Sequence, residues 1–353
     1  IFSNYVSSFQ WRGEICISPE ELFNECRRYT MPVNIVWEMF ITNSVRCNSQ
    51  YNAEGLYKIL MSLPLNKRDR LWSIYVNRLT GRDENRLIQI IKMYDSGKKI
   101  EFSSKKERAL LLELLCWCLA SSDRWMRDVT SKAMVEILKD DFSLCKPLLE
   151  KFQPVNDPYI IQRLYGVMFG AATKRTDNCR EEYKALAVFI YETIFNGGDV
   201  YPDILLRDYA RLLIERFIYE FPDESGNFVY DKILPPYKSE DILDLKNQEY
   251  SERDFSGGMA RIITSMKFEG MGMYGDFGRY VFQSAISNFD VNQKKVYNYA
   301  VYFILKELGY DEDLFGDYDC EVGRYDYNRH KVAKTERIGK KYQWIALHNI
   351  LAR

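Results

Sequence analysis

The sequence predicts an all-α protein: a helical-repeat solenoid of the HEAT or TPR kind, followed by a mostly helical C-terminal unit. Three observations predict this fold. Apolar residues recur at helical spacing through roughly the first 220 residues. Strand signals are almost absent, with few alternating runs and no Asn-Gly or Asp-Gly hairpin between β-rich segments. An Asp/Arg pattern also returns at intervals close to the length of a two-helix repeat unit.

Two segments show the helical spacing most clearly. In one, an apolar stripe lies opposite charged residues; the stripe is Met126, Val129, Ala133 and Ile137, and the charged residues are Arg124, Asp128 and Lys132. In the other, the expected stripe is Leu205, Tyr209, Leu212, Leu213 and Phe217, opposite Arg207, Asp208, Arg211 and Glu215. Asp123, Asp157 and Asp203 each stand where a helix should begin, which suits an N-cap.

The Asp/Arg pattern suggests a repeat. Asp123 is followed by Arg127 and Asp203 by Arg207 at the same spacing, while Asp157 leads to Arg163 between them. The three arginines fall 36 and 44 residues apart, near the length of a HEAT or armadillo unit. The alternative is an irregular helical bundle in which this spacing is a coincidence.

Composition changes over residues 221–256, which contain three of the ten prolines. No proline follows Pro236, yet ten of the 19 glycines do. We therefore predict a repeat array over 1–220, a crossover or linker over 221–256 and a second unit over 257–353. Helical patterns within this unit cover approximately 258–267, 277–289, 293–308 and 337–353.

Charge and cysteine content narrow the class of protein. The net charge of −1 argues against a general nucleic-acid binder, which needs a basic surface. Eight cysteines form no CxxC pair, and no apolar run is long enough to span a bilayer, so we expect reduced thiols, no membrane contact and a cytoplasmic location. The chain begins at Ile1 without an initiator Met and stops within an amphipathic run, from which we expect a fragment of a longer polypeptide.

Recognisable catalytic motifs are missing from the sequence. It holds no GxxxxGK[ST] phosphate loop, no HExxH and no Cys/His metal spacing, and its two histidines lie in the last 24 residues. Gly275-Asp276-Phe277-Gly278 contains a kinase-like Asp-Phe-Gly triplet without the other kinase motifs. We therefore expect no enzyme activity and no cofactor in this chain. A hydrolase with an unrecognised pair of carboxylates remains as an alternative.

Candidate binding residues gather in two segments. Glycines alternate with aromatic and charged residues over 271–280, where they allow close backbone approach or tight turns, and Arg279 and Tyr280 offer contact area. An acidic run over 311–321 precedes a basic run over 329–341. The candidates in and after the basic run are Arg329, Arg337, Lys340, Lys341, Tyr342 and Trp344. The two runs can also face each other or be separately solvated, contributing little.

The string ERIGKKYQWIA, residues 336–346, resembles a sequence in the C-terminal sensor regions of Avs-type antiphage STAND NTPases. Residues 275–280 and 156–163 resemble the same regions, and the resemblance covers approximately residues 120–353. In that family an effector domain and a nucleotide-binding STAND module precede a helical, repeat-like sensor. The sensor recognises a conserved phage protein, either the large terminase subunit or the portal protein, and binding promotes oligomerisation of the parent protein.

The resemblance implies that this chain is a sensor fragment that binds a phage protein and forms oligomers through domains of the parent protein. It does not select between terminase and portal, and it assigns no individual contact residue. A HEAT-like scaffold for protein–protein interaction without a defence role is the alternative function.

Overall fold

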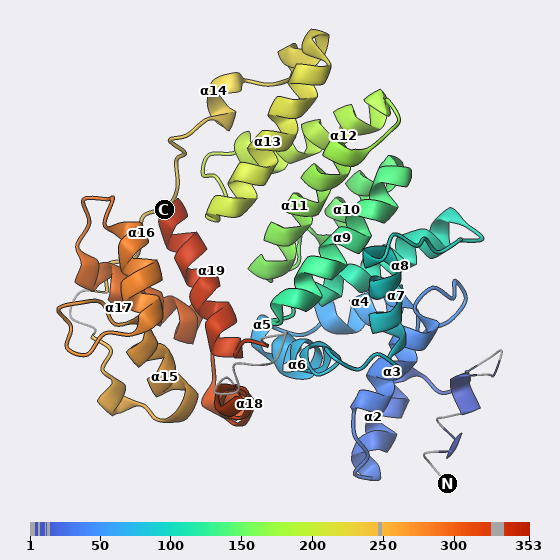
Figure 1. Ribbon diagram of the computed structural model, residues 1–353, viewed down its shortest axis with the longest axis horizontal. Coiled ribbons are helices and arrows are strands. Elements are labelled where there is room, and N and C mark those ends of the chain that lie inside the picture. Colours follow the sequence, from blue (N-terminus) through green and yellow to red (C-terminus); the bar gives the residue numbers. More distant parts are fainter. Residues whose placement is uncertain (1–3, 6–7, 11, 13–14, 246–248, 326–334) are drawn as a thin grey trace.

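The computed structural model confirms the all-α fold (Figure 1). It describes residues 4–5, 8–10, 12, 15–245, 249–325 and 335–353. Within these ranges there is no β-strand, and an isolated bridge pairs Asp123 with Thr335. None of the described helices is both long and apolar enough to cross a bilayer.

Helices of residues 34–220 alternate between two layers, as expected for a solenoid of helix pairs. Neighbouring helices of each layer pack side by side. The first layer is α3 (Asn34–Asn43), α7 (Arg86–Asp95), α9 (Arg124–Asp140), α11 (Pro158–Lys174) and α13 (Ile204–Glu220). The second layer is α4 (Ala53–Met61), α8 (Lys105–Cys118), η3 (Phe142–Leu144) with α10 (Cys145–Phe152), and α12 (Arg180–Ile190) with η4 (Tyr191–Phe195).

Two further segments adjoin the layers. Before them, η1 (Ser8–Gln10) and α2 (Pro19–Arg28) pack against α3. Between α4 and α7 a continuous helix over 65–77 is made of α5 (Leu65–Arg68), the π-helical turn η2 (Asp69–Ser73) and α6 (Ile74–Asn77). This continuous helix lies beside the C-terminal unit (Figure 1).

The longest helices of the first layer begin in the same way. α9, α11 and α13 each have 17 residues, and the side chains of Asp123, Asp157 and Asp203 accept hydrogen bonds from N–H groups of their first turns. These N-caps confirm the positions predicted from the sequence.

The Asp/Arg pattern corresponds to a shared local structure at two of its three positions. Arg127 donates to the carbonyl of Ser121 at 2.6 Å, and Arg207 donates to the carbonyl of Tyr201 at 2.7 Å. In each case the arginine reaches back to the carbonyl six residues earlier. Arg163 differs, because it pairs with Asp128 of the neighbouring helix at 3.0 Å.

One of the two predicted stripes is correct and the other is shifted. Met126, Val129, Ala133 and Ile137 are all buried, as predicted. In α13 the buried face is Leu206, Ala210, Leu213, Ile214 and Phe217, with Arg207 also buried. Leu205, predicted to be inside, is 38% exposed. The predicted face was wrong because Arg207 points into a junction with the C-terminal unit, where it satisfies backbone carbonyls.

A connecting segment leads from α13 to the C-terminal unit. η5 (Pro222–Asn227) and α14 (Tyr230–Ile233) pack on the solenoid, and η6 (Glu252–Asp254) precedes the second unit. That unit comprises α15 (Gly257–Met266), η7 (Phe277–Gln283) with α16 (Ser284–Ile286), α17 (Gln293–Tyr302) with η8 (Phe303–Glu307), α18 (Glu312–Tyr325) and α19 (Ile338–Ala352). The sequence indicated each of these segments except α18.

The glycine-rich segment after α15 makes the close backbone approach that the sequence suggested. A Cβ at Gly275 would stand 2.4 Å from the backbone of Ser265, and one at Gly278 would stand 2.2 Å from the carbonyl oxygen of Lys267. Gly270 and Gly272 adopt positive φ angles of 91° and 92°, which favour glycine. These contacts fold the segment back onto the end of α15.

The apolar side chains form two cores. The first runs through the helix layers, and the second fills the C-terminal unit. The second core also includes Leu65 and Ile74 of the 65–77 helix and Tyr159 of α11. The C-terminal unit is therefore packed onto the solenoid through apolar contacts.

Candidate functional site

Helix α19 lies across the N-terminal ends of α9, α11 and α13 (Figure 1). Just before α19, the Thr335 hydroxyl donates to the Asp123 cap at 2.7 Å. Lys341 reaches the Asp157 cap at 2.9 Å, and the Asn349 amide donates to the carbonyl of Pro202, next to the Asp203 cap, at 3.1 Å. A 15-residue helix spans roughly 22 Å, which suits two spacings of about 10 Å between packed helices.

The centre of this junction is a buried ion cluster. Lys341 donates to Asp69 at 2.8 Å and to Asp157 at 2.9 Å, and all three side chains are fully buried. Arg68, also fully buried, donates to the side chain of Asn156. Burial raises the pKa of Asp69, and the Lys341 ammonium opposes that change. Two cations and two carboxylates thus join α19, the 65–77 helix and α11.

The burial of this cluster argues against a carboxylate-based hydrolase site at this position. A hydrolase of this kind needs two acids close together, and Asp69 and Asp157 meet that requirement because both contact the Lys341 ammonium group. They are sealed from solvent and held by Lys341, so a substrate cannot reach them. Within the described residues, no group of three or more His, Cys, Asp and Glu side chains is arranged to hold a metal ion.

The C-terminal end of α19 is held by a polar network. The Gln162 amide donates to both carboxylate oxygens of Asp203 at 3.0 Å and lies 2.7 Å from His348 Nδ1. Burial lowers the pKa of His348, against the opposing effect of Asp203. Arg207 donates to the carbonyl of Ala352 at 2.5 Å.

The N-terminal end of α19 is capped by a side chain of α18. Asp319, 1% exposed, accepts hydrogen bonds from the backbone N–H groups of Ile338 at 2.6 Å and Gly339 at 2.9 Å, and from the Tyr310 hydroxyl at 2.9 Å. Burial raises the pKa of Asp319, against the opposing effect of these hydrogen bonds. The carboxylate occupies the positive end of the α19 dipole.

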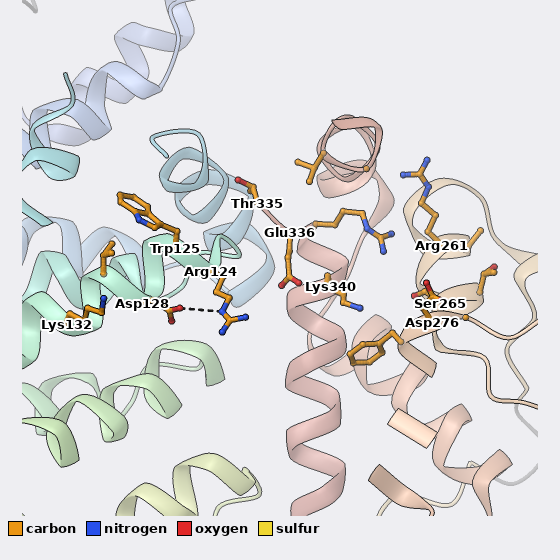
Figure 2. Close-up of a pocket in the computed structure, with 18 of the residues that line it drawn as sticks. Arg124, Trp125, Asp128, Lys132, Arg261, Ser265, Asp276, Thr335, Glu336 and Lys340 are labelled. Atoms are coloured by element: carbon orange, nitrogen blue, oxygen red, sulfur yellow. Dashed lines mark ion pairs between the residues drawn. The ribbon is translucent and has the colours of Figure 1, made fainter. Parts of the chain in front are cut away.

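An open cleft of about 1200 Å³ lies beside this capped end, between α9 and the C-terminal unit. Figure 2 shows α9 on one side and the start of α19, α15 and the Asp276 segment on the other. The charged side chains that line the cleft are Asp95, Arg124, Asp128, Lys132, Arg261, Asp276, Glu336, Arg337 and Lys340. Trp125 and Phe277 contribute aromatic surface.

The charges on the α9 side of the cleft are partly paired, both within α9 and with Asp95 at the end of α7. Arg124 lies 3.4 Å from Asp128, and Lys132 lies 3.2 Å from Asp95. The Arg124 side chain is nevertheless 82% exposed and projects into the gap that Glu336 also faces (Figure 2). Burial raises the pKa of Glu336, and nearby cations including Lys340 oppose that change. The cleft is thus strongly charged with both signs.

The structure separates the residues predicted to bind. Arg337 and Lys340 line the cleft, with the Lys340 ammonium 4.0 Å from the Phe277 ring centroid. Trp344 is half-buried and makes an edge contact with the same ring at 5.1 Å. Phe277 therefore brings Lys340 and Trp344 together.

Lys341 and Tyr342 are fully buried, which corrects their prediction as surface contacts. Both are held in the junction, where a partner's side chains cannot reach them. Arg279 pairs with Glu269 at 2.8 Å and does not line the cleft. Tyr280 is 62% exposed, with its ring against that of Tyr274. Arg329 lies outside the described residues.

Most residues of the cleft were not predicted as binding residues from the sequence, and Arg124 and Arg261 are the arginines among them. Arg124 carries a signal, because it directly follows the Asp123 cap, and a cation in the first turn of a helix opposes the helix dipole. Such a placement suggests a role other than stabilising its own helix. Arg261 shows no local signal, because its position in the cleft depends on the docking of α15 against α18 and α19.

Comparison with protein-family models, with curated proteins and with solved structures finds no match to this chain.

Proposed function

We propose that this chain is the ligand-recognition region of a cytoplasmic bacterial antiviral STAND NTPase. It binds a conserved phage protein, the large terminase subunit or the portal protein, and thereby promotes oligomerisation of the parent protein. The observation that supports this proposal most directly is the position of the 336–346 string. It forms the start of α19, which lines the open cleft with Arg337 and Lys340 and joins both units through Lys341.

This arrangement suits recognition coupled to a change of state. A ligand that contacts Arg337 or Lys340 acts on the helix whose next residue, Lys341, holds the junction together. If the ligand binds one arrangement of the two units more tightly than another, it shifts the population toward that arrangement. Oligomerisation of the parent protein is then the consequence of that shift.

The size and surface of the region favour a macromolecular ligand. The cleft is open and charged, and the neighbouring glycine-rich segment exposes Met273 (86%) and Tyr280 (62%). Exposed aromatic and methionine side chains are frequent in protein–protein interfaces. These features support a proposed contact surface that includes the cleft and this segment.

A HEAT-like scaffold without a defence role is the second candidate function. The two helix layers themselves support it, because stacked helix pairs serve many unrelated complexes. A stable complex with a bacterial host protein, together with no complex with phage proteins, would favour the scaffold.

The test is co-purification of the chain with a panel of phage large terminase subunits and portal proteins, at low and at high salt. A matched pair of variants assigns any binding to the cleft. Arg124→Glu reverses a cleft charge, and Lys58→Glu reverses a charge of similar exposure (74%) that also pairs with an acid four residues away. We expect retention of one phage protein class by the wild type and by Lys58→Glu, and reduced retention by Arg124→Glu.

Failure of every phage protein to bind the folded chain would contradict the proposed function. Binding that both variants retain equally would keep the function and move the contact surface away from the α9 side of the cleft.

A further inference from the structure

Two arginines, one from α15 and one at the start of α19, approach the same glycine in the cleft wall. Arg261 of α15 and Arg337 at the start of α19 both pack against Gly323 of α18. A Cβ at Gly323 would stand 2.6 Å from Arg261 Nη1 and 3.8 Å from Arg337 Cδ. The absence of a side chain at this position gives the Arg261 guanidinium group the room it occupies, beside Arg337.

Neither guanidinium group forms an ion pair with a carboxylate in the part of the chain that the structure describes, and Asp319 and Glu336 act on Arg337 only electrostatically. Arg261 donates a long hydrogen bond of 3.4 Å to the Asp319 carbonyl and lies 4.0 Å from Cys320 Sγ. The Arg337 side chain makes no hydrogen bond or ion pair with the described residues. The Asp319 carboxylate is already engaged by Ile338, Gly339 and Tyr310.

Two neighbouring cations repel each other, and an anion between them reduces that repulsion. The guanidinium group presents planar donors that match the two oxygens of a carboxylate or a phosphate. Arg124 adds a third cation on the opposite wall of the cleft. The residues around Gly323 therefore favour an anionic ligand group.

The remaining charges of the cleft favour carboxylates on a protein over a chain of phosphates. Asp95, Asp128, Asp276 and Glu336 also line the cleft, and they repel a nucleic-acid backbone that carries a charge at every nucleotide. A protein segment can place acidic residues at the arginines and neutral or basic residues elsewhere. The net charge of the chain, −1, gives no general attraction for nucleic acid.

We propose that the cleft binds an acidic segment of the protein partner, with a carboxylate held between Arg261 and Arg337. This inference rests on the proposed function in protein recognition and adds the chemical character of the surface that is recognised. Gly323 acts as a positioning residue, because a Cβ there would stand 2.6 Å from Arg261 Nη1 and displace that guanidinium group.

The test measures binding of a fluorescein-labelled peptide rich in Asp and Glu to the complete chain by fluorescence anisotropy. A peptide of the same length with Asn and Gln in place of the acids, and a labelled single-stranded DNA, serve as comparison probes. The variants are Arg261→Gln/Arg337→Gln, Gly323→Ala, and the surface control Lys58→Gln, each checked for helical content by circular dichroism.

We expect the acidic peptide to bind more tightly than its amide analogue and than the DNA, and more weakly at high salt. The double variant should raise its Kd about tenfold or more, since both charged donors are lost. Gly323→Ala should raise the Kd in the same direction without removing a charge, and Lys58→Gln should leave it unchanged.

Absence of peptide binding, an unchanged Kd in the double variant, or tighter binding of the DNA would overturn the inference. Its failure is distinguishable from failure of the proposed function. If a phage protein is captured equally by wild type and double variant, recognition stands and the arginine site is wrong. If the acidic peptide binds at the arginines but no phage protein is captured, the site stands and the proposed function is wrong.

Discussion

Replacing Lys341 with methionine removes the cation that pairs with Asp69 and Asp157 and leaves Arg68 as the other cation of the buried cluster. Methionine fills a similar volume, so the change acts mainly through charge. Breaking a buried ion pair by removing one partner costs approximately 3–5 kcal/mol, because the remaining charge stays desolvated. We therefore expect Lys341→Met to lower the free energy of unfolding by about that amount at neutral pH.

The effect should depend on pH with a defined sign. Burial already raises the pKa of Asp69, and loss of the Lys341 ammonium, which opposes that change, raises it further. The folded variant then binds more protons than the unfolded chain between the ordinary Asp pKa, about 3.9, and the raised folded value. The stability of the variant should consequently rise, relative to wild type, as the pH is lowered into this window.

Urea unfolding followed by circular dichroism, at neutral and at mildly acidic pH, measures both effects. Lys58→Met is the control, because Lys58 is 74% exposed and pairs with Glu54 at 3.7 Å. Surface changes of this kind usually stay within about 0.5 kcal/mol. The triple variant Asp69→Asn/Asp157→Asn/Lys341→Met should recover part of the loss, since asparagine can still cap α11. If Lys341→Met behaved like Lys58→Met, the assignment of the cluster as a stabilising link would be refuted.

Three further predictions concern the cap of α19, its histidine and the glycine-rich segment after α15. Asp319→Ala should destabilise the fold by about 3 kcal/mol, because it leaves buried backbone donors unsatisfied, whereas Asp319→Asn should cost less; urea unfolding compares the two. The pKa of His348 is lowered in the folded state, so the stability of the fold should fall as the pH drops below the ordinary histidine pKa of about 6.5. His348→Gln should reduce this dependence of stability on pH. Thermal unfolding over a pH series checks this, and equal slopes for wild type and variant would contradict it. Gly278→Ala places a Cβ against backbone and should cost about 1–3 kcal/mol, whereas Gly226→Ala, where the Cβ meets nothing within 4 Å, should have little effect; thermal unfolding of both variants decides.

The sequence was informative where structure depends on neighbours along the chain. The caps at Asp123, Asp157 and Asp203 and the stripe through Met126 were predicted correctly, since an N-cap and a helical face are local properties. The face of α13 was wrong because Arg207 turns inward to reach carbonyls that include Ala352, 145 positions away.

The contacts of α19 with the helix layers, and the cleft beside them, were harder to predict from the sequence. Lys341 belongs to a basic run that reads as a solvated surface, and its partners Asp69 and Asp157 are distant in sequence. Helix α18 was not predicted because its sequence reads as an acidic run over 311–321. Its buried side includes Phe315 and Asp319. Local charge patterning did not distinguish residues that face solvent from residues that meet an opposite charge after folding.

The junction also sets an order of assembly during synthesis. Lys341 and Asp69 are 272 positions apart, so the ribosome completes both helix layers well before it makes α19. The layers can form from contacts between adjacent helices, and until α19 arrives the carboxylates of Asp69 and Asp157 remain in water. The side of the cleft that contains Arg337 forms only when α19 has been synthesised. A nascent chain therefore forms the two helix layers before it forms the complete cleft, and it cannot engage the proposed ligand there until α19 has docked.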